Sequence, residues 1–183
     1  MMQRRIQLAA GVAVVSIASV VGTTALAGGG SEIRERLTGF QEVPVVSTGA
    51  EGKFRAEVRR DRIDYKLRWE DLEGTVTQAH IHLGQRDVNG GISVWLCGNP
   101  SAGPPPITPP AGTQTCPLTN PASIEGTVTA AQVVGPTGQG IGPQEFDELL
   151  RAIRSGVTYA NVHSSTFGGG EIRAQLKDDR NDD

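Results

Sequence analysis

The stretch 53-KFRAEVRRDRIDYKLRW-69 decides the fold class, because apolar and charged residues alternate through both of its halves. Alternation with a period of two gives a β-strand one apolar face and one polar face. Arg60 and Asp61 separate the halves and suit a tight turn, so the stretch predicts a β-hairpin. The face that we expect to be buried carries Phe54, Ala56, Val58, Ile63, Tyr65, Leu67 and Trp69.

Six further segments have the length and composition of short strands, and glycine or proline separates most of them. With the hairpin they make about eight strands. Many short strands with such punctuation predict an all-β fold, either an antiparallel β-sandwich or a Greek-key barrel. The six segments are 37-LTGFQEV-43, 75-TVTQAHIHL-83, 91-GISVWLC-97, 123-SIEGTVT-129, 157-VTYANVH-163 and 170-GEIRAQL-176.

One segment, 143-PQEFDELLRAIRSG-156, has the periodicity of a helix instead. Its apolar residues fall at i, i+3, i+4 and i+7, and a proline precedes them while a glycine follows. We expect a short α-helix that packs against the sheet and has no chemical role. Its apolar positions are Phe146, Leu149, Leu150 and Ile153.

The first 27 residues have the pattern of a secretory signal peptide. Arg4 and Arg5 precede an apolar run that ends at 25-ALA-27, and glycines follow it. An uncleaved membrane anchor is the alternative, because the run is about long enough to span a bilayer. With cleavage we expect no stable membrane span, a linker over residues 28–36, and a location outside the cell or in the periplasm or envelope.

The charge of the mature chain argues against two classes of partner. Removing residues 1–27 removes two of the 17 Lys and Arg residues and none of the 20 Asp and Glu residues, which leaves a net charge near −5. Nucleic acid and anionic membrane are therefore not expected as partners. The tail 177-KDDRNDD-183 lacks an apolar anchor, and we expect it to be disordered.

Cys97 and Cys116 are the two cysteines of the chain, and the residues between them are rich in Gly and Pro. In an exported protein such a pair predicts a disulfide that closes a surface loop. The alternative is a thiolate metal ligand, but a third soft ligand is missing nearby.

The three histidines fall in two short strand segments, 78-QAHIHLG-84 and 161-NVH-163. Residues i and i+2 of a strand share a face, so His80 and His82 can bind one metal ion, and His163 would be a third ligand if the strands are neighbours. Three neutral imidazoles suit copper, with zinc as the alternative.

A second interpretation places the apolar residues Ala79, Ile81 and Leu83 in the core. The histidines would then lie on the solvated face or in a hydrogen-bonded cluster and bind no metal.

Five more polar residues belong to the same motifs. Gln78 shares the face of His80, and Asn161 that of His163. Glu171 and Arg173 also share a face, which suggests a cross-strand ion pair, and Glu42 could join a partly buried one. We predict supporting roles for these five residues.

Sequence motifs of common enzymes are missing. The chain has no Gly-x-Ser-x-Gly, no phosphate-binding glycine loop, no His-Glu-x-x-His and no Cys-x-x-Cys. We therefore assign no catalytic residue, and we favour a binding protein over an enzyme.

Three separated motifs, in order, resemble the CHRD (chordin-type) domain family over residues 37–176. They are 37-LTGFQEVPVVSTGAEG-52, 79-AHIHLGQRDVNGGISVWL-96 and 157-VTYANVHSSTFGGGEIRAQL-176. The family's motif positions correspond here to Glu42, Pro44, His80, His82, Asn161, Val162, His163, Gly170, Glu171, Ile172 and Arg173. Val45, where the family often has a second proline, and the long insert at 98–115 depart from its pattern.

The resemblance implies a β-rich extracellular binding module, because members named for chordin are extracellular and many stand-alone members are exported bacterial proteins. From this resemblance and the three histidines together, we expect a mononuclear copper site. We also expect a partner that is an extracellular protein or surface. One alternative is a copper-dependent redox enzyme similar to superoxide dismutase, which also has a His-x-His strand in a β-barrel. The other is a structural or adhesive domain without metal.

Overall fold

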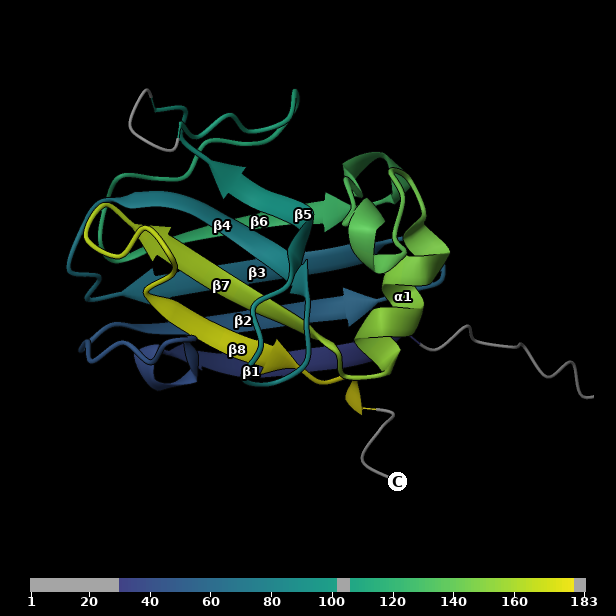
Figure 1. Cartoon of the computed structure of the whole chain (residues 1–183), viewed down its shortest axis with the longest axis horizontal. Helices are drawn as coiled ribbons and strands as arrows, with labels where there is room; N and C mark the ends of the chain where they lie inside the picture. The colour runs from purple at the N-terminus through teal and green to yellow at the C-terminus, as the bar shows by residue number, and fades with distance from the viewer. Residues whose placement is uncertain (1–29, 102–105, 180–183) are drawn as a thin grey trace, which may run out of the picture.

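The computed structural model describes residues 30–101 and 106–179, so the expected signal peptide lies outside the described residues. Strands dominate the chain (Figure 1). Their bounds are β1 Ser31–Thr38, β2 Glu51–Val58, β3 Ile63–Glu70, β4 Val76–Leu83, β5 Gly91–Gly98, β6 Ala122–Val128, β7 Thr158–Ser164 and β8 Ile172–Leu176. Short 3₁₀ turns are η1 Gly39–Gln41, η2 Ala130–Gln132 and η3 Thr137–Gln139.

All eight strands belong to one antiparallel sheet in the order β5-β4-β7-β8-β1-β2-β3-β6. The sheet curves until its two end strands, β5 and β6, contact each other, which makes a nearly closed barrel. The prediction of an antiparallel, all-β sandwich or barrel with one helix is confirmed.

The hairpin that decides the fold class forms as predicted. β2 and β3 pair from Glu51↔Glu70 to Val58↔Ile63, and Arg59 N–H donates to the carbonyl of Arg62 across the turn. The seven apolar residues of the two strands are at most 8% exposed and lie in the core of the barrel. Burial of such side chains stabilises the fold by roughly 1.5–3 kcal/mol each.

The helix α1 spans Phe146–Arg154 and lies across one end of the barrel (Figure 1). Phe146, Leu149, Leu150 and Ile153 are buried, as their spacing predicted. The helix ends before Gly156, which has a φ of +67° that favours glycine. Within residues 30–101 and 106–179, no helix has the length and hydropathy needed to cross a membrane.

Both ends of the domain differ from the prediction. The first strand is β1, Ser31–Thr38, so residues 31–36 of the expected linker belong to the sheet. The segment expected as a strand, 37–43, turns after Thr38, because Glu42 N–H and Val46 N–H both donate to the carbonyl of Gly39.

The tail begins as an ordered segment. Asp178 is fully buried and accepts a hydrogen bond of 2.6 Å from Ser31 Oγ, and Asp179 accepts one from Glu32 N–H. Disorder was therefore the wrong expectation for residues 177–179, while residues 180–183 lie outside the described part. These two carboxylates attach the tail to the start of β1.

The disulfide Cys97–Cys116 is present and closes a loop with a sequence separation of 19. Both cysteines are buried and belong to the hydrophobic core. Since the crosslink limits the conformations of the unfolded chain, we expect Cys97→Ser/Cys116→Ser to lower the free energy of unfolding by about 3 kcal/mol. Urea unfolding measures this loss, and wild-type protein kept reduced should match the variant. Equal stability of variant and oxidised wild type would contradict the prediction.

Candidate metal centre

Two neighbouring strands bring the three histidines together. β4 and β7 pair antiparallel in a register that sets Gln78 opposite His163 and His80 opposite Asn161. Because alternate residues share a face, His80, His82 and His163 all point to the outer side of the barrel, away from Ala79 and Ile81. The pairing of β4 with β5 shifts register twice, once just before His80 and once just after Ile81. Such irregularities change the direction of side chains in a strand.

The three imidazoles are in mutual contact. His80 Nδ1 lies 3.2 Å from His163 Nε2, and ring centroids are 5.2 Å apart for His80 and His82 and 6.4 Å apart for His82 and His163. One ligand nitrogen from each ring can be chosen so that all three lie within 4.8 Å of one another. The structure therefore brings together all three predicted ligands.

Backbone carbonyls orient two of the rings. His82 Nδ1 lies 2.9 Å from the carbonyl oxygen of Gly90, and His163 Nδ1 lies 3.0 Å from that of Gly168. A carbonyl only accepts, so in both neutral rings Nδ1 carries the proton and Nε2 carries the lone pair. Metal-binding histidines commonly have such a partner on the second nitrogen.

Burial keeps the histidines neutral. His80 is 1%, His82 8% and His163 7% exposed. Burial lowers the pKa of His163 to about 4 and that of His80 well below its usual value, where His163 and His82 add repulsion. Burial also lowers the pKa of His82, against its contacts with Gly90 and Asn161. The interpretation that placed the histidines on a solvated face is wrong, because both faces of β4 are covered.

Two ring nitrogens have unused lone pairs. Within the described residues, no hydrogen bond of standard geometry reaches His80 Nε2 or His82 Nε2, and both atoms are buried. A buried polar atom without a partner costs about 1–3 kcal/mol. A bound cation is one way to recover that free energy.

Two aromatic side chains enclose the rings. Tyr159 stacks on His82 with a centroid distance of 4.6 Å and an interplanar angle of 2°, and Trp95 meets His80 edge-on at 4.3 Å. These contacts hold the imidazoles in place and exclude water.

Arg173 holds the loop that covers the cluster. Its guanidinium donates to the carbonyls of Gln85 and Val88 and to Asn89 Oδ1, and it lies 3.4 Å from the centroid of the Tyr159 ring. Residues 84–90, the covering loop, thus have several contacts with β7 and β8, and Gly90 N–H also donates to the Tyr159 hydroxyl. The loop places the Gly90 carbonyl at His82.

Glu171 does not pair with Arg173, which corrects the expected ion pair. Its Oε1 accepts hydrogen bonds from Thr48 Oγ1 and Glu73 N–H, at 3.0 and 2.8 Å. The residue is fully buried and joins two loops at one end of the barrel.

Glu42 is buried beside the cluster, and burial raises the pKa of its carboxyl to about 7. Arg173, Val43 N–H and Asn161 oppose that rise. The carboxyl packs on Gly170, where an added Cβ would lie 2.5 Å from Glu42 Oε1. Glu42 and the buried Asn161 therefore adjoin the three histidines, whereas Gln78 is only half-buried at the rim of the cluster.

The donor set is three neutral nitrogens. Ligand bonds of about 2.0–2.1 Å place two nitrogens on one metal at most about 4.2 Å apart. A separation of 4.8 Å therefore requires at least one imidazole to shift on binding. The site resembles the three-histidine sets of mononuclear copper and zinc centres.

Four residues of the site were missed by sequence reasoning. Tyr159 lies two positions before Asn161, so the period of two would have found it. Trp95 could have been found only by knowing the pairing of β4 with β5. Gly90 and Gly168 contribute carbonyls, for which a sequence carries no signal.

Comparison with known proteins gave one match. The family model of the CHRD domain matches residues 33–176. No curated protein and no solved structure matches the chain.

Proposed function

Because the chain belongs to the CHRD domain family, which covers residues 33–176, we propose that it is an exported binding module that holds one copper ion. The ligands are His80, His82 and His163. The observation that carries the proposal is the pair of carbonyls at Nδ1 of His82 and His163, which turns the Nε2 lone pairs of both rings toward the buried cluster. Among the residues that the structure describes, His82 Nε2 has no hydrogen-bond partner there, and His163 Nε2 faces only His80 Nδ1.

Copper fits this donor set better than zinc. Among divalent first-row ions, copper binds most tightly to a given set of nitrogen ligands. The three histidines are the only group of this kind found in residues 30–101 and 106–179, and no thiolate or carboxylate belongs to it. Zinc is the expected competitor.

Export agrees with two features of the chain. The signal-like pattern of residues 1–27 precedes the domain, and the Cys97–Cys116 disulfide is stable in oxidising compartments. We place the protein outside the cell or in the periplasm or envelope. There it would bind an extracellular protein or surface.

The burial of the histidine cluster favours a metal-binding module over a redox enzyme. A redox enzyme must admit its substrate to the metal, and His80 is only 1% exposed beneath Trp95 and the covering loop. A domain without metal would leave His80 Nε2 and His82 Nε2 as buried acceptors without a donor. A bound metal ion gives both of these nitrogens a partner.

The first test is the metal content of the purified protein after exposure to copper or zinc and removal of free metal. We expect about one copper per chain in wild type and a loss of binding in His82→Ala, because two imidazoles remain. Gln78→Ala, at the rim of the cluster, is the matched control and should bind as wild type does.

Thermal unfolding provides a second readout. Copper at 100 times its dissociation constant should stabilise wild type by about 2.7 kcal/mol and leave His82→Ala unchanged. Copper well below one per chain in wild type, or full binding by His82→Ala, would refute the site. A folded His82→Ala with native circular dichroism excludes misfolding as the cause.

A further inference from the structure

The outer face of β1, β2 and β3 carries two rows of basic side chains. The register sets Arg34 opposite Arg55 and Arg55 opposite Lys66, while Arg36 faces Lys53 and Lys53 faces Arg68. We call these residues the basic band: Arg34, Arg36, Lys53, Arg55, Lys66 and Arg68. All six are exposed.

This arrangement opposes folding. Like charges directly opposite each other on neighbouring strands destabilise a sheet, and the band contains four such pairs. The chain as a whole has a net charge of −3. Six cations gathered on one face of an acidic protein therefore need an explanation other than stability.

Acidic residues neutralise only the edges of the band. Arg34 pairs with Glu32 and Arg36 with Glu51. Arg68 lies 3.2 Å from Glu70, and Lys66 lies 3.6 Å from Glu125. In the centre, Lys53 and Arg55 take part in no ion pair within the described part of the chain. The two central cations are therefore available to an external anion.

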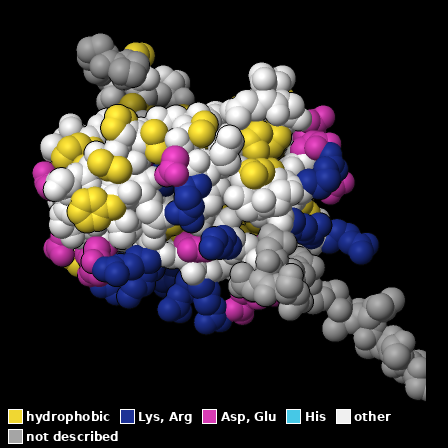
Figure 2. Space-filling model, turned by 60° about the horizontal axis from the view of Figure 1, so that its bottom comes forward, with side chains coloured by type: hydrophobic (Ala, Val, Ile, Leu, Met, Phe, Trp, Pro, Cys, Tyr) yellow, Lys and Arg dark blue, Asp and Glu magenta, His cyan; other side chains and the backbone are white. Residues whose placement is uncertain are grey.

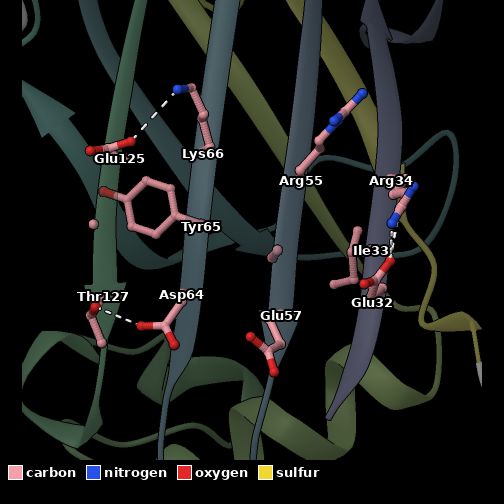
Figure 3. A pocket seen from close by; sticks show the side chains of 12 residues that line it. Glu32, Ile33, Arg34, Arg55, Glu57, Asp64, Tyr65, Lys66, Glu125 and Thr127 are labelled. Atoms are coloured by element: carbon pink, nitrogen blue, oxygen red, sulfur yellow. Dashed lines mark hydrogen bonds and ion pairs between the residues drawn. The ribbon is translucent and has the colours of Figure 1, made fainter.

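The band borders two hollows in the surface. One of about 600 Å³ is lined by Arg34, Arg55 and Lys66, and another of about 190 Å³ lies beside Arg36 and Lys53. Figure 3 shows the basic side chains of Arg34, Arg55 and Lys66 in one row across three strands. The acidic side chains of Glu32, Glu57 and Asp64 form the next row. Figure 2 shows Lys and Arg side chains gathered along one edge of the molecule.

We propose that the basic band binds a linear acidic polysaccharide. Three neighbouring strands span about 10 Å, and residues i and i+2 are about 7 Å apart, so the band is a narrow strip across the strands. Arginine binds carboxylate and sulfate groups in a bidentate manner. A chain that carries such groups at intervals can contact both rows.

The borders of the band select against wider partners. Glu57 and Asp64 flank it on one side, and Glu51 and Glu70 on the other. A membrane surface or a nucleic acid duplex would also cover these acids and be repelled. No aromatic side chain is among the outward residues of β1 to β3 for stacking on bases, and no apolar one provides the core of a protein interface.

Binding to polygalacturonate, dextran sulfate and neutral dextran in 0.15 M salt tests the proposal. We expect the wild-type protein to bind one or both acidic chains and not dextran. Lys53→Gln/Arg55→Gln should bind at least about tenfold more weakly, and the slope of log Kd against log salt should become clearly smaller, since the two cations without an acidic partner are lost. Whichever acidic chain binds identifies carboxylate or sulfate as the recognised group.

Arg60→Gln/Lys177→Gln removes the same charge outside the band and is the matched control, which should bind as wild type does. Lys53→Gln/Arg55→Gln should fold at least as stably as wild type, because the repulsion is relieved. Absence of wild-type binding, or equal weakening by both double variants, would overturn the proposal.

Tighter band-dependent binding of poly-glutamate would assign the face to an acidic protein. His82→Ala should bind the polysaccharide normally, so this test is independent of the metal.

Discussion

Gly90→Ala is expected to lower the free energy of unfolding by about 3 kcal/mol or more, which denaturant unfolding measures. A Cβ at this position would lie 1.6 Å from the Leu83 carbonyl oxygen and 2.6 Å from the Leu83 carbonyl carbon. Both are backbone atoms of β4, the strand that carries His80 and His82, so a side-chain rotation cannot relieve the clash. The covering loop or the end of β4 has to move.

The same substitution is expected to weaken copper binding. If the loop moves, the Gly90 carbonyl leaves His82 Nδ1, and the loss of such a partner typically reduces metal affinity by about 10- to 100-fold. Gly168→Ala is the matched control. Its carbonyl holds His163, but an added Cβ meets nothing within 4 Å, so stability and affinity should stay near wild type. Wild-type stability of Gly90→Ala, or an equal effect of both substitutions, would contradict this explanation.

The sequence predicts strands well where one face is apolar and the other charged. In the hairpin β2–β3, each inward position is apolar, and the prediction matches the structure within two residues at each end. β1 was missed because Glu35 interrupts the apolar positions Ile33 and Leu37. The turn at Gly39 depends on a close approach to the Val46 carbonyl, which is a tertiary contact without a local signal.

The ligands of the metal centre could be predicted from the sequence, but the groups that surround them could not. The period of two places His80 and His82 on one face, and only the pairing of β4 with β7 adds His163. Burial of that face comes from the covering loop, which Arg173 holds through backbone carbonyls. Because carbonyls are common to all residues, the sequence suggested the wrong partner for Arg173, namely Glu171.

Acidification of the metal-free protein from pH 6.5 to pH 4 is expected to remove about 3 kcal/mol of stability through His163 alone. Its pKa is about 4 in the folded protein and near 6.5 when unfolded, so through most of this range the unfolded chain takes up the proton and the folded chain does not. Stability is therefore lost as the pH falls. The lowered pKa values of His80 and His82 act in the same direction.

Glu42 acts in the opposite direction between pH 7 and pH 4.5. Its pKa is about 7 in the folded protein against 4.5 in the unfolded chain, so the folded state takes up the proton first and gains stability as the pH falls. Glu42→Gln removes this contribution. The variant should therefore be more stable than wild type at pH 8 by up to about 3 kcal/mol, lose that advantage by pH 4.5, and show a steeper acid loss.

Urea unfolding with a chelator present, in steps from pH 8 to pH 4, separates the two contributions. Glu125→Gln changes an exposed carboxylate, and its curve should run parallel to that of wild type. A gain of stability on acidification below pH 6.5 in Glu42→Gln, which lacks the Glu42 contribution, would mean that the histidines are protonated in the folded state. A curve for Glu42→Gln parallel to wild type would mean that this carboxyl is ionised beside Arg173. Either result would require a different charge distribution at the cluster, and the first would also make the histidines poor metal ligands near neutral pH.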